Sequence, residues 1–436
     1  MPTVLLLGTC DTKLSELLYT KAQIESHSSC TVLIMDIGRN NTSHPDISIT
    51  QSDLLSSKTN LSNLDRAEYI SALAPHATAQ TSNLLHKNRI HAILAIGGSC
   101  GTGLASTVMR DALPVGFPKL MVSTMASGDV APYIGETDIA IMYSVVDIAG
   151  RNRVLDRVLA NAAGAIAGMA SSYYSSQSDD KGKGQEKEGG KGCRIAISMF
   201  GVTTPAAMRA QEYFKERLPG CEVYIFHATG SGGRAMERLI REGQIDAVLD
   251  LTTTEMADEV VGGVLSAGPE RLYAATEMDI PRVISVGACD MVNFGSPETV
   301  PRRFQSGGDD GSDGGPKRLF HEHNPAVTLM RTTGQECTAI ARRIGYNIRG
   351  AGGRKCTVVL PTDGVSMLDA PGQPFWDPEA DKMLFDMLEE QAKAAGIPVV
   401  RDSRHINEPE FAQAVAEDLV QLIQGKLNEE TGVVYR

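Results

Sequence analysis

The sequence predicts an α/β fold made of two Rossmann-like domains with mostly parallel sheets. Short apolar runs recur along the chain and end in glycine- or hydroxyl-rich loops, beginning with VLLLG at residues 4–8. Stretches with helical spacing, such as LSELLYTKAQIES, follow these runs, and alternating strands and helices favour a parallel sheet. A segment with the composition of a flexible linker, residues 171–192, separates two such series.

The first series predicts an N-terminal nucleotide-binding domain over residues 1–170. Its apolar runs are typical of strands buried on both faces. Polar residues 39–64 are expected to be irregular, and a helix is expected from about Arg151 to Met169. The expected strands lie at residues 4–8, 31–38, 92–98, 118–128 and 138–147.

The second series predicts a C-terminal α/β domain over residues 193–436. Residues 304–317, FQSGGDDGSDGGPK, form a disordered-looking insert within it. Because ligands of parallel sheets lie at the carboxyl ends of the strands, the loops there are the expected sites. The expected strands lie at residues 194–201, 247–255, 281–290, 355–364 and 397–406, and residues 221–233 are expected to form a strand with a glycine loop.

Bulk properties exclude several classes of protein. The formal net charge of −12 argues against a nucleic-acid binder, which needs basic surface to displace counterions. The N-terminal stretch MPTVLLLGTCDTK lacks the features of a signal peptide, and no apolar run is long enough to span a membrane. The eight cysteines form no CxxC pair, which favours a reducing compartment. We therefore expect a cytoplasmic protein without membrane contact.

Three loops at predicted strand ends favour phosphate binding: GTCDTK (residues 8–13), GGSCGTG (97–103) and STMASG (123–128). Glycine lets the backbone approach an anion, and helix N-termini supply N–H donors. Lys13 could add positive charge, and Asp36 at the end of the second strand could accept a ribose hydroxyl. None of the loops matches a Walker A or GxGxxG pattern, so a plain tight turn is the alternative for each one.

These loops belong to a longer series of motifs by which the chain resembles the family of the tomato mosaic virus resistance protein, an inhibitor of viral RNA replication. Its bacterial and fungal relatives are otherwise uncharacterised. The inhibition of a virus is not carried over to this chain. The matching stretches span nearly the whole chain in order: GTCDTK, AIGGSCGTGLAS, STMASG, YSVVDIAGRNRV, MFGVTTP, FHATGSGGRAME, LDLTTTE, ISVGACDMVNFG, HEHN, LMRT and DAPG.

The resemblance implies two α/β domains, a homodimer, and ATP bound in the N-terminal domain, alone or with Mg²⁺. Cys10 and Cys100 stand within two of the loops, at positions where smaller residues are expected. By motif, the ATP-binding role carries over to Gly8, Thr9, Asp11, Thr12, Lys13, Gly97, Gly98, Ser99, Gly101, Thr102, Ser127 and Gly128.

Most candidate catalytic residues lie in the second half: His227, Asp290, His323 and Arg331. One hypothesis is an enzyme site for a phosphorylated or carboxylated metabolite, at an interdomain or C-terminal-domain position. Arg331 would hold the anion there, while a histidine and a carboxylate exchange protons. A rival hypothesis is a metal site at His321 and His323, and a third is that these residues are structural. The sequence thus favours an ATP-binding protein of unknown physiological role, with the enzyme as the alternative.

Overall fold

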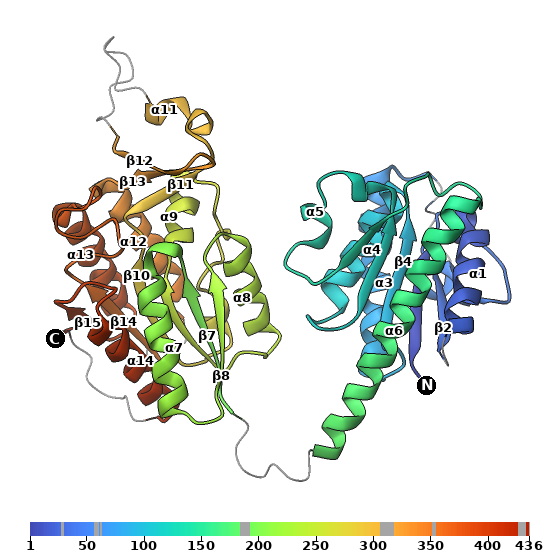
Figure 1. The fold of residues 1–436 in the computed structure, drawn as a ribbon, viewed down its shortest axis with the longest axis horizontal. Coiled ribbons are helices and arrows are strands. Elements are labelled where there is room, and N and C mark those ends of the chain that lie inside the picture. The colour runs from blue at the N-terminus through green and yellow to red at the C-terminus, as the bar shows by residue number, and fades with distance from the viewer. Residues whose placement is uncertain are drawn as a thin grey trace. The chain divides into compact units, whose positions relative to one another are not determined.

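The computed structural model describes residues 1–27, 30–55, 61, 63–183, 192–305, 318–350, 355–425 and 433–435. The chain divides into two compact units, Met1–Gly189 and Gly190–Arg436. Each unit is built on a parallel sheet covered by helices, which confirms the predicted α/β fold class (Figure 1). None of the helices in the described parts of the chain is both long and apolar enough to cross a membrane.

Six parallel strands form the sheet of the N-terminal unit, in the order β3-β2-β1-β4-β5-β6. The chain reverses its direction of travel across the sheet between β1 and β4. This is the strand order of a Rossmann fold, in which ligands bind outside the carboxyl ends of the strands at that reversal. The strands are β1 (Thr3–Gly8), β2 (Thr31–Asp36), β3 (Ile47–Ile49), β4 (Ala92–Gly97), β5 (Lys119–Ser123) and β6 (Ala140–Tyr143).

Helices cover both faces of this sheet. On one face, α1 (Cys10–His27) and α6 (Arg153–Lys183) bury Leu17 and Ile166 against alternate residues of β1, β2 and β4. On the other face, α3 (Arg66–His86) and α4 (Ser99–Ala112) bury Leu73 and Leu104. The shorter elements are α2 (Gln51–Leu54), η1 (Thr124–Ser127) and α5 (Ala131–Ile134).

Helix α6 is longer than the sequence predicts. It continues to Lys183, so the segment expected as a linker, residues 171–192, begins inside a helix. Two aromatic contacts pack the first turn of this extension: the ring centroid of Tyr173 lies 5.1 Å from that of Phe117, and that of Tyr174 lies 4.9 Å from that of His91. Residues 184–191 of the expected linker lie outside the described residues.

Seven parallel strands form the main sheet of the C-terminal unit, in the order β16-β15-β14-β10-β9-β7-β8. Counted along the chain, this is the 2-1-3-4-5 order of flavodoxin-like folds, extended by two strands, with its reversal between β7 and β9. The strands are β7 (Arg194–Met199), β8 (Glu222–His227), β9 (Ala247–Thr252), β10 (Arg282–Gly287), β14 (Cys356–Pro361), β15 (Val399–Asp402) and β16 (Val433–Tyr435).

Helices also cover both faces of the second sheet. One face carries α7 (Thr204–Arg217) and α14 (Pro409–Ile423). The opposite face carries α8 (Ser231–Arg241), α9 (Thr254–Val261), α10 (Ala274–Glu277), α12 (Gly334–Ile348) and α13 (Pro378–Ala394).

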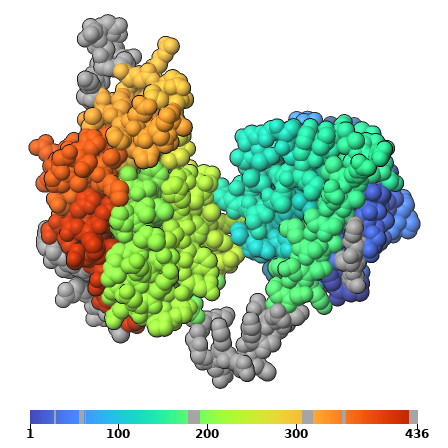
Figure 2. Space-filling view, in the orientation of Figure 1, coloured from blue at the N-terminus to red at the C-terminus, as the bar shows by residue number. Residues whose placement is uncertain are grey.

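A small antiparallel sheet, which the sequence did not predict, lies beyond the carboxyl end of β10. Its order is β11-β13-β12, with β11 (Met291–Phe294), β12 (Phe320–Asn324) and β13 (Val327–Arg331). Together with η3 (Pro297–Thr299) and α11 (Arg302–Gln305) it forms a lobe at one end of this unit, coloured orange in Figure 2. The expected insert 304–317 begins in α11, and its residues 306–317 lie outside the described part.

Candidate functional site

Two glycines let helices start close to the carboxyl ends of β1 and β4. A Cβ on Gly8 would lie 2.6 Å from the side chain of Leu17 in α1. A Cβ on Gly97 would lie 2.9 Å from the backbone carbon of Gly101 in α4. These two strands flank the reversal point of the sheet, so the glycines bring two helix N-termini to the crevice where Rossmann folds bind ligands.

The N-terminus of α4 is open to an anion. Its N-cap residue, Gly98, makes no side-chain cap hydrogen bond, and the first turn contains no acidic residue. A Cβ on Gly98 would meet nothing closer than the hydroxyl oxygen of Thr124, 3.8 Å away. Ser99 and Cys100 in the first turn are half-buried. Because the first N–H groups of a helix lack intrahelical partners, this end of α4 offers donors and positive dipole charge to a phosphate.

Thr102 ties this loop to the neighbouring one. Its hydroxyl lies 2.6 Å from that of Ser123, and the Ser123 oxygen accepts the backbone N–H of Met125 at 2.9 Å. Thr102 and Ser123 are both buried, whereas Ser127 and Gly128 of the STMASG loop are exposed. Thr102 therefore holds two loops at the crevice in place, and the more exposed residues are the ones that a ligand can reach.

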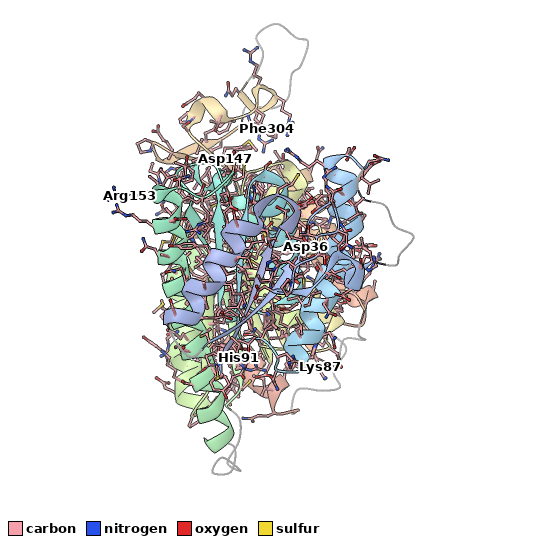
Figure 3. The ribbon with its side chains drawn as sticks, turned by 90° about the vertical axis from the view of Figure 1, so that its right-hand side faces the viewer. Asp36, Lys87, His91, Asp147, Arg153 and Phe304 are labelled. Atoms are coloured by element: carbon pink, nitrogen blue, oxygen red, sulfur yellow. The ribbon has the colours of Figure 1, made fainter. Side chains whose placement is uncertain are left out.

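Asp36 ends β2, beside Gly8 at the carboxyl end of β1. Its side chain is fully buried, and its Oδ1 accepts the backbone N–H groups of Cys10 at 3.0 Å and Gly38 at 2.8 Å. Burial raises the pKa of this carboxyl, and the nearby charge of Asp11 adds to that. In Figure 3, Asp36 and Asp147 lie towards the opposite end of the N-terminal unit from His91 and Lys87. Asp36 organises the loop, and its expected contact with a ribose stays a prediction that this buried position does not support.

Asp11 is half-buried in the first turn of α1 and accepts hydrogen bonds from the segment after β2. Its Oδ2 accepts the backbone N–H groups of Arg39 and Asn40, each at 3.1 Å. Its Oδ1 is buried and has no hydrogen-bond partner among the described residues. The neighbouring side chains of Thr9 and Thr12 share a hydrogen bond of 2.8 Å between their hydroxyls.

Lys13 interrupts α1 with a non-helical conformation, φ −134° and ψ 24°. Its ammonium donates to the backbone carbonyl of Ile148 at 2.5 Å, in the loop that follows β6. Lys13 therefore joins two loops at the same sheet edge. A phosphate would have to compete with that carbonyl for the ammonium group.

Two further residues complete this region. The hydroxyl of Tyr69 donates to the carbonyl of Ile37, and the guanidinium of Arg39 lies 4.8 Å from the centre of the Tyr69 ring. Both residues belong to segments that the sequence marked only as helical or irregular. Their contacts join positions about thirty residues apart, and no local motif signals such a pairing.

The candidate catalytic residues of the second half differ in exposure and in their contacts. His227 is exposed at the end of β8, where its ring stacks on Phe200 at 5.5 Å. His323 is exposed on β12. Asp290 and Arg331 do come together, because an Arg331 nitrogen lies 3.4 Å from the Asp290 carbonyl oxygen, but both are buried.

The H-x-H pair gains no third ligand in the described residues, which contain no group of three or more His, Cys, Asp or Glu side chains able to hold a metal. His321 instead packs edge-on against Phe375, with 6.2 Å between ring centroids. The metal hypothesis for His321 and His323 thus stays a prediction without support from the surrounding side chains.

Glu255, at the end of the LDLTTTE motif, is fully buried and has a structural role. One of its carboxylate oxygens accepts the backbone N–H groups of Gly230 and Gly233, at 2.7 and 3.0 Å. The other accepts from Arg271 at 2.7 Å, and Arg271 also pairs with Asp250 and Glu237. The buried Arg271 was not found from the sequence, because its three acidic partners lie 16 to 34 residues away along the chain.

Comparisons with known proteins cover both units. The model of the uncharacterised protein family UPF0261 N-terminal domain matches residues 2–175, and that of its C-terminal domain matches residues 192–423. A UPF0261 protein of Clostridium tetani is 43% identical over 433 residues, covering 97% of this chain and 99% of that protein.

Tomato proteins are similar as well. The ToMV susceptible protein tm-1 of Solanum lycopersicum is 38% identical over 97% of this chain and 56% of that protein. The ToMV resistance protein Tm-1 is 44% identical over 76% of this chain and 41% of that protein. The chain thus spans about half of each tomato protein. Among solved structures, the match to a UDP-N-acetylglucosamine 2-epimerase from Rickettsia bellii covers 65% of this chain and 78% of that protein's chain, at 10% identity. Its TM-score of 0.20 is too low to bear on the fold.

Proposed function

Because the chain belongs to the UPF0261 family, whose function is uncharacterised, we propose a function from the geometry: the N-terminal unit binds the phosphates of ATP in the crevice between β1 and β4. The observation that carries this proposal is the uncapped N-terminus of α4 at the reversal point of a Rossmann-ordered sheet. ATP is chosen over other phosphate compounds because of the family resemblance in the loop motifs.

Mg²⁺ fits the same proposal through Asp11. Its Oδ1 is buried and lacks a partner among the described residues, although it belongs to the loop proposed to meet the phosphates. Mg²⁺ in nucleotide sites is commonly held by one or two carboxylates together with phosphate oxygens. Asp11 would supply the protein's carboxylate, and the ion would neutralise phosphate charge.

The test compares two glycine-to-aspartate variants by isothermal titration with ATP and Mg²⁺. In Gly98→Asp the new carboxylate stands at the N-cap of α4, where aspartate is favoured, so folding should be unaffected while phosphate binding is blocked. We expect Kd to rise at least about tenfold, which corresponds to ~1.4 kcal/mol. Gly168→Asp on α6 is the control, because Gly168 is exposed and has open space around its Cβ position.

Native protein that releases no heat with ATP would overturn the proposal, and so would equal affinities for the two variants. A homodimer also stays a proposal from the family resemblance, to be checked by light scattering. The alternative of a C-terminal enzyme site has less support, because His227 and His323 are exposed whereas Asp290 and Arg331 are buried.

A further inference from the structure

A buried ionic cluster joins the small antiparallel sheet to the rest of the C-terminal unit. We call it the Arg331 junction and define it as Arg331, Asp290, Asp369 and Asp381. The four side chains come from β13, the turn before β11, the loop after β14, and the first turn of α13. All four residues are at most 5% exposed.

Most of the hydrogen bonds that the Arg331 guanidinium donates go to backbone carbonyls. It donates to the backbone oxygens of Phe375 at 2.8 Å and Asp377 at 3.3 Å. Its closest carboxylate contact is Asp381, at 2.5 Å, while the Asp369 carboxylate lies 3.7 Å away.

The carboxylates of the junction have fewer hydrogen-bond donors around them than they have oxygens. Ser366 donates to one oxygen of Asp290 at 2.8 Å, and the N–H of Val365 donates to one oxygen of Asp369 at 3.0 Å. Each of the three carboxylates keeps one buried oxygen without a hydrogen-bond partner among the described residues: Asp290 Oδ1, Asp369 Oδ1 and Asp381 Oδ2. Buried carboxylate oxygens are normally paired, so a proton donor is missing from this arrangement.

The balance of charges in the junction also indicates that a proton is bound there. Three ionised carboxylates around one guanidinium would leave two uncompensated negative charges inside the protein, which is costly at low dielectric. We propose that the Arg331 junction holds at least one proton at neutral pH and that losing this proton loosens the three-stranded sheet β11-β13-β12 from the C-terminal unit. A protonated carboxyl both removes one negative charge and supplies an O–H donor to a neighbouring oxygen.

The direction of the pKa shifts agrees with this geometry. Burial, and then the charge of Asp369, raises the pKa of Asp290 to about 7. Burial also raises the pKa of Asp381 to about 8, against the lowering effect of Arg331. Other groups near the junction are Ser366, Thr332, Cys289 and Cys337, and burial raises the pKa of the Cys337 thiol to about 11, so it stays neutral in this range. Two further titratable groups lie close by: the ring of His405 hydrogen-bonds the Ser366 carbonyl, and Asp258 of α9 accepts both N–H groups of Asn293 in β11. Burial raises the pKa of Asp258 to about 7, so the Asp290 variant is needed to separate its titration from that of the junction.

The expected pH dependence follows from linkage. The folded-state pKa values of Asp290 and Asp381 exceed the unfolded value of about 3.9, so the folded junction binds more protons. The stability gained from protonation is complete below pH ~3.9 and is lost as the pH rises through about 7 to 8. Opening of the small sheet should therefore become easier with rising pH and level off above that range.

Hydrogen exchange of the full-length protein tests the proposal. After correction for intrinsic exchange, the opening constant of β11 and β13 amides should rise by up to about tenfold per pH unit below pH 7 for each proton released. Asp290→Asn mimics the protonated carboxyl and should reduce this slope. Asp363→Asn is the control, because Asp363 is exposed on the same loop, and its slope should match that of the native protein.

Infrared difference spectroscopy gives a second readout, because Asp258 also has a raised pKa of about 7 and only a variant assigns the band. The part of the protonated-carboxyl C=O band that Asp290→Asn removes should be present at pH 6 and absent at pH 9. A flat exchange profile in the native protein would overturn the proposal. Absence of that infrared band, or a stoichiometric metal ion found by mass spectrometry of the native protein, would also overturn it.

Discussion

At the residue scale, the carboxylate of Asp36 holds two neighbouring loops of the N-terminal unit together. It accepts backbone N–H groups at the start of α1 and just beyond β2. Its role is therefore to fix the backbone at the start of α1, which carries Asp11, and just beyond β2. An acidic residue at the end of the second strand can thus stabilise the neighbouring loops instead of binding a ribose.

We predict that Asp36→Ala lowers the free energy of unfolding by about 2–4 kcal/mol, because two buried N–H groups lose their acceptor. Asp36→Asn should cost much less, since the amide oxygen still accepts both bonds and the neutral group suits a buried site that raises the pKa of the native carboxyl. Urea denaturation measures both changes. Asp46→Ala, at a partly exposed ion pair with Lys21, is the control and should leave stability nearly unchanged, because solvent screens such pairs.

At the element scale, the two consecutive glycines at the start of α4, Gly97 and Gly98, have different roles. A Cβ at residue 97 would press on the first turn of the helix, whereas a Cβ at residue 98 meets open space. The first glycine sets the approach of the helix to β4, and the second leaves the end of the helix accessible.

We therefore predict opposite behaviour for two neighbouring alanine variants. Gly97→Ala should destabilise the protein by about 1–3 kcal/mol through overpacking, and it should weaken ATP binding because α4 shifts. Gly98→Ala should cost at most ~1 kcal/mol, since its φ of −78° suits alanine and only the N-cap preference for glycine over alanine is lost. Thermal denaturation together with ATP titration distinguishes them, and equal losses in both variants would contradict this account of the loop.

The elements that the sequence predicted share one property, which is that local pattern determines them. Buried strands such as β1 and β4, and the loops that end them, are visible as apolar runs that close in glycine. Strand β3 and the sheet β11-β13-β12 were missed because their segments are short or polar and gain stability from partners distant in the sequence. The burial of Asp36 and the grouping of three carboxylates near Arg331 also depend on residues distant in the sequence, so the sequence did not predict them.

At the scale of the whole molecule, the two units use similar elements in different strand orders. The N-terminal sheet reverses between its first and fourth strands, and the main C-terminal sheet between β7 and β9. The repeated series of strand, loop and helix in the sequence therefore does not amount to a duplicated topology. Each unit has its own buried clusters, one set around β1 and β4 and another around β9 and β10.

Because each unit carries its own core, we predict two calorimetric transitions in the full-length protein, of which ATP moves only one. Leu94→Ala and Leu249→Ala truncate fully buried side chains of β4 and β9, and each should destabilise its own unit by about 2–5 kcal/mol. ATP at a hundred times its Kd should add about 2.7 kcal/mol to the unit that binds it. The transition raised by ATP should be the one lowered by Leu94→Ala. A single transition shifted by both substitutions would show that the two cores unfold together, and a shift by ATP of the transition assigned to Leu249 would place the nucleotide in the other unit.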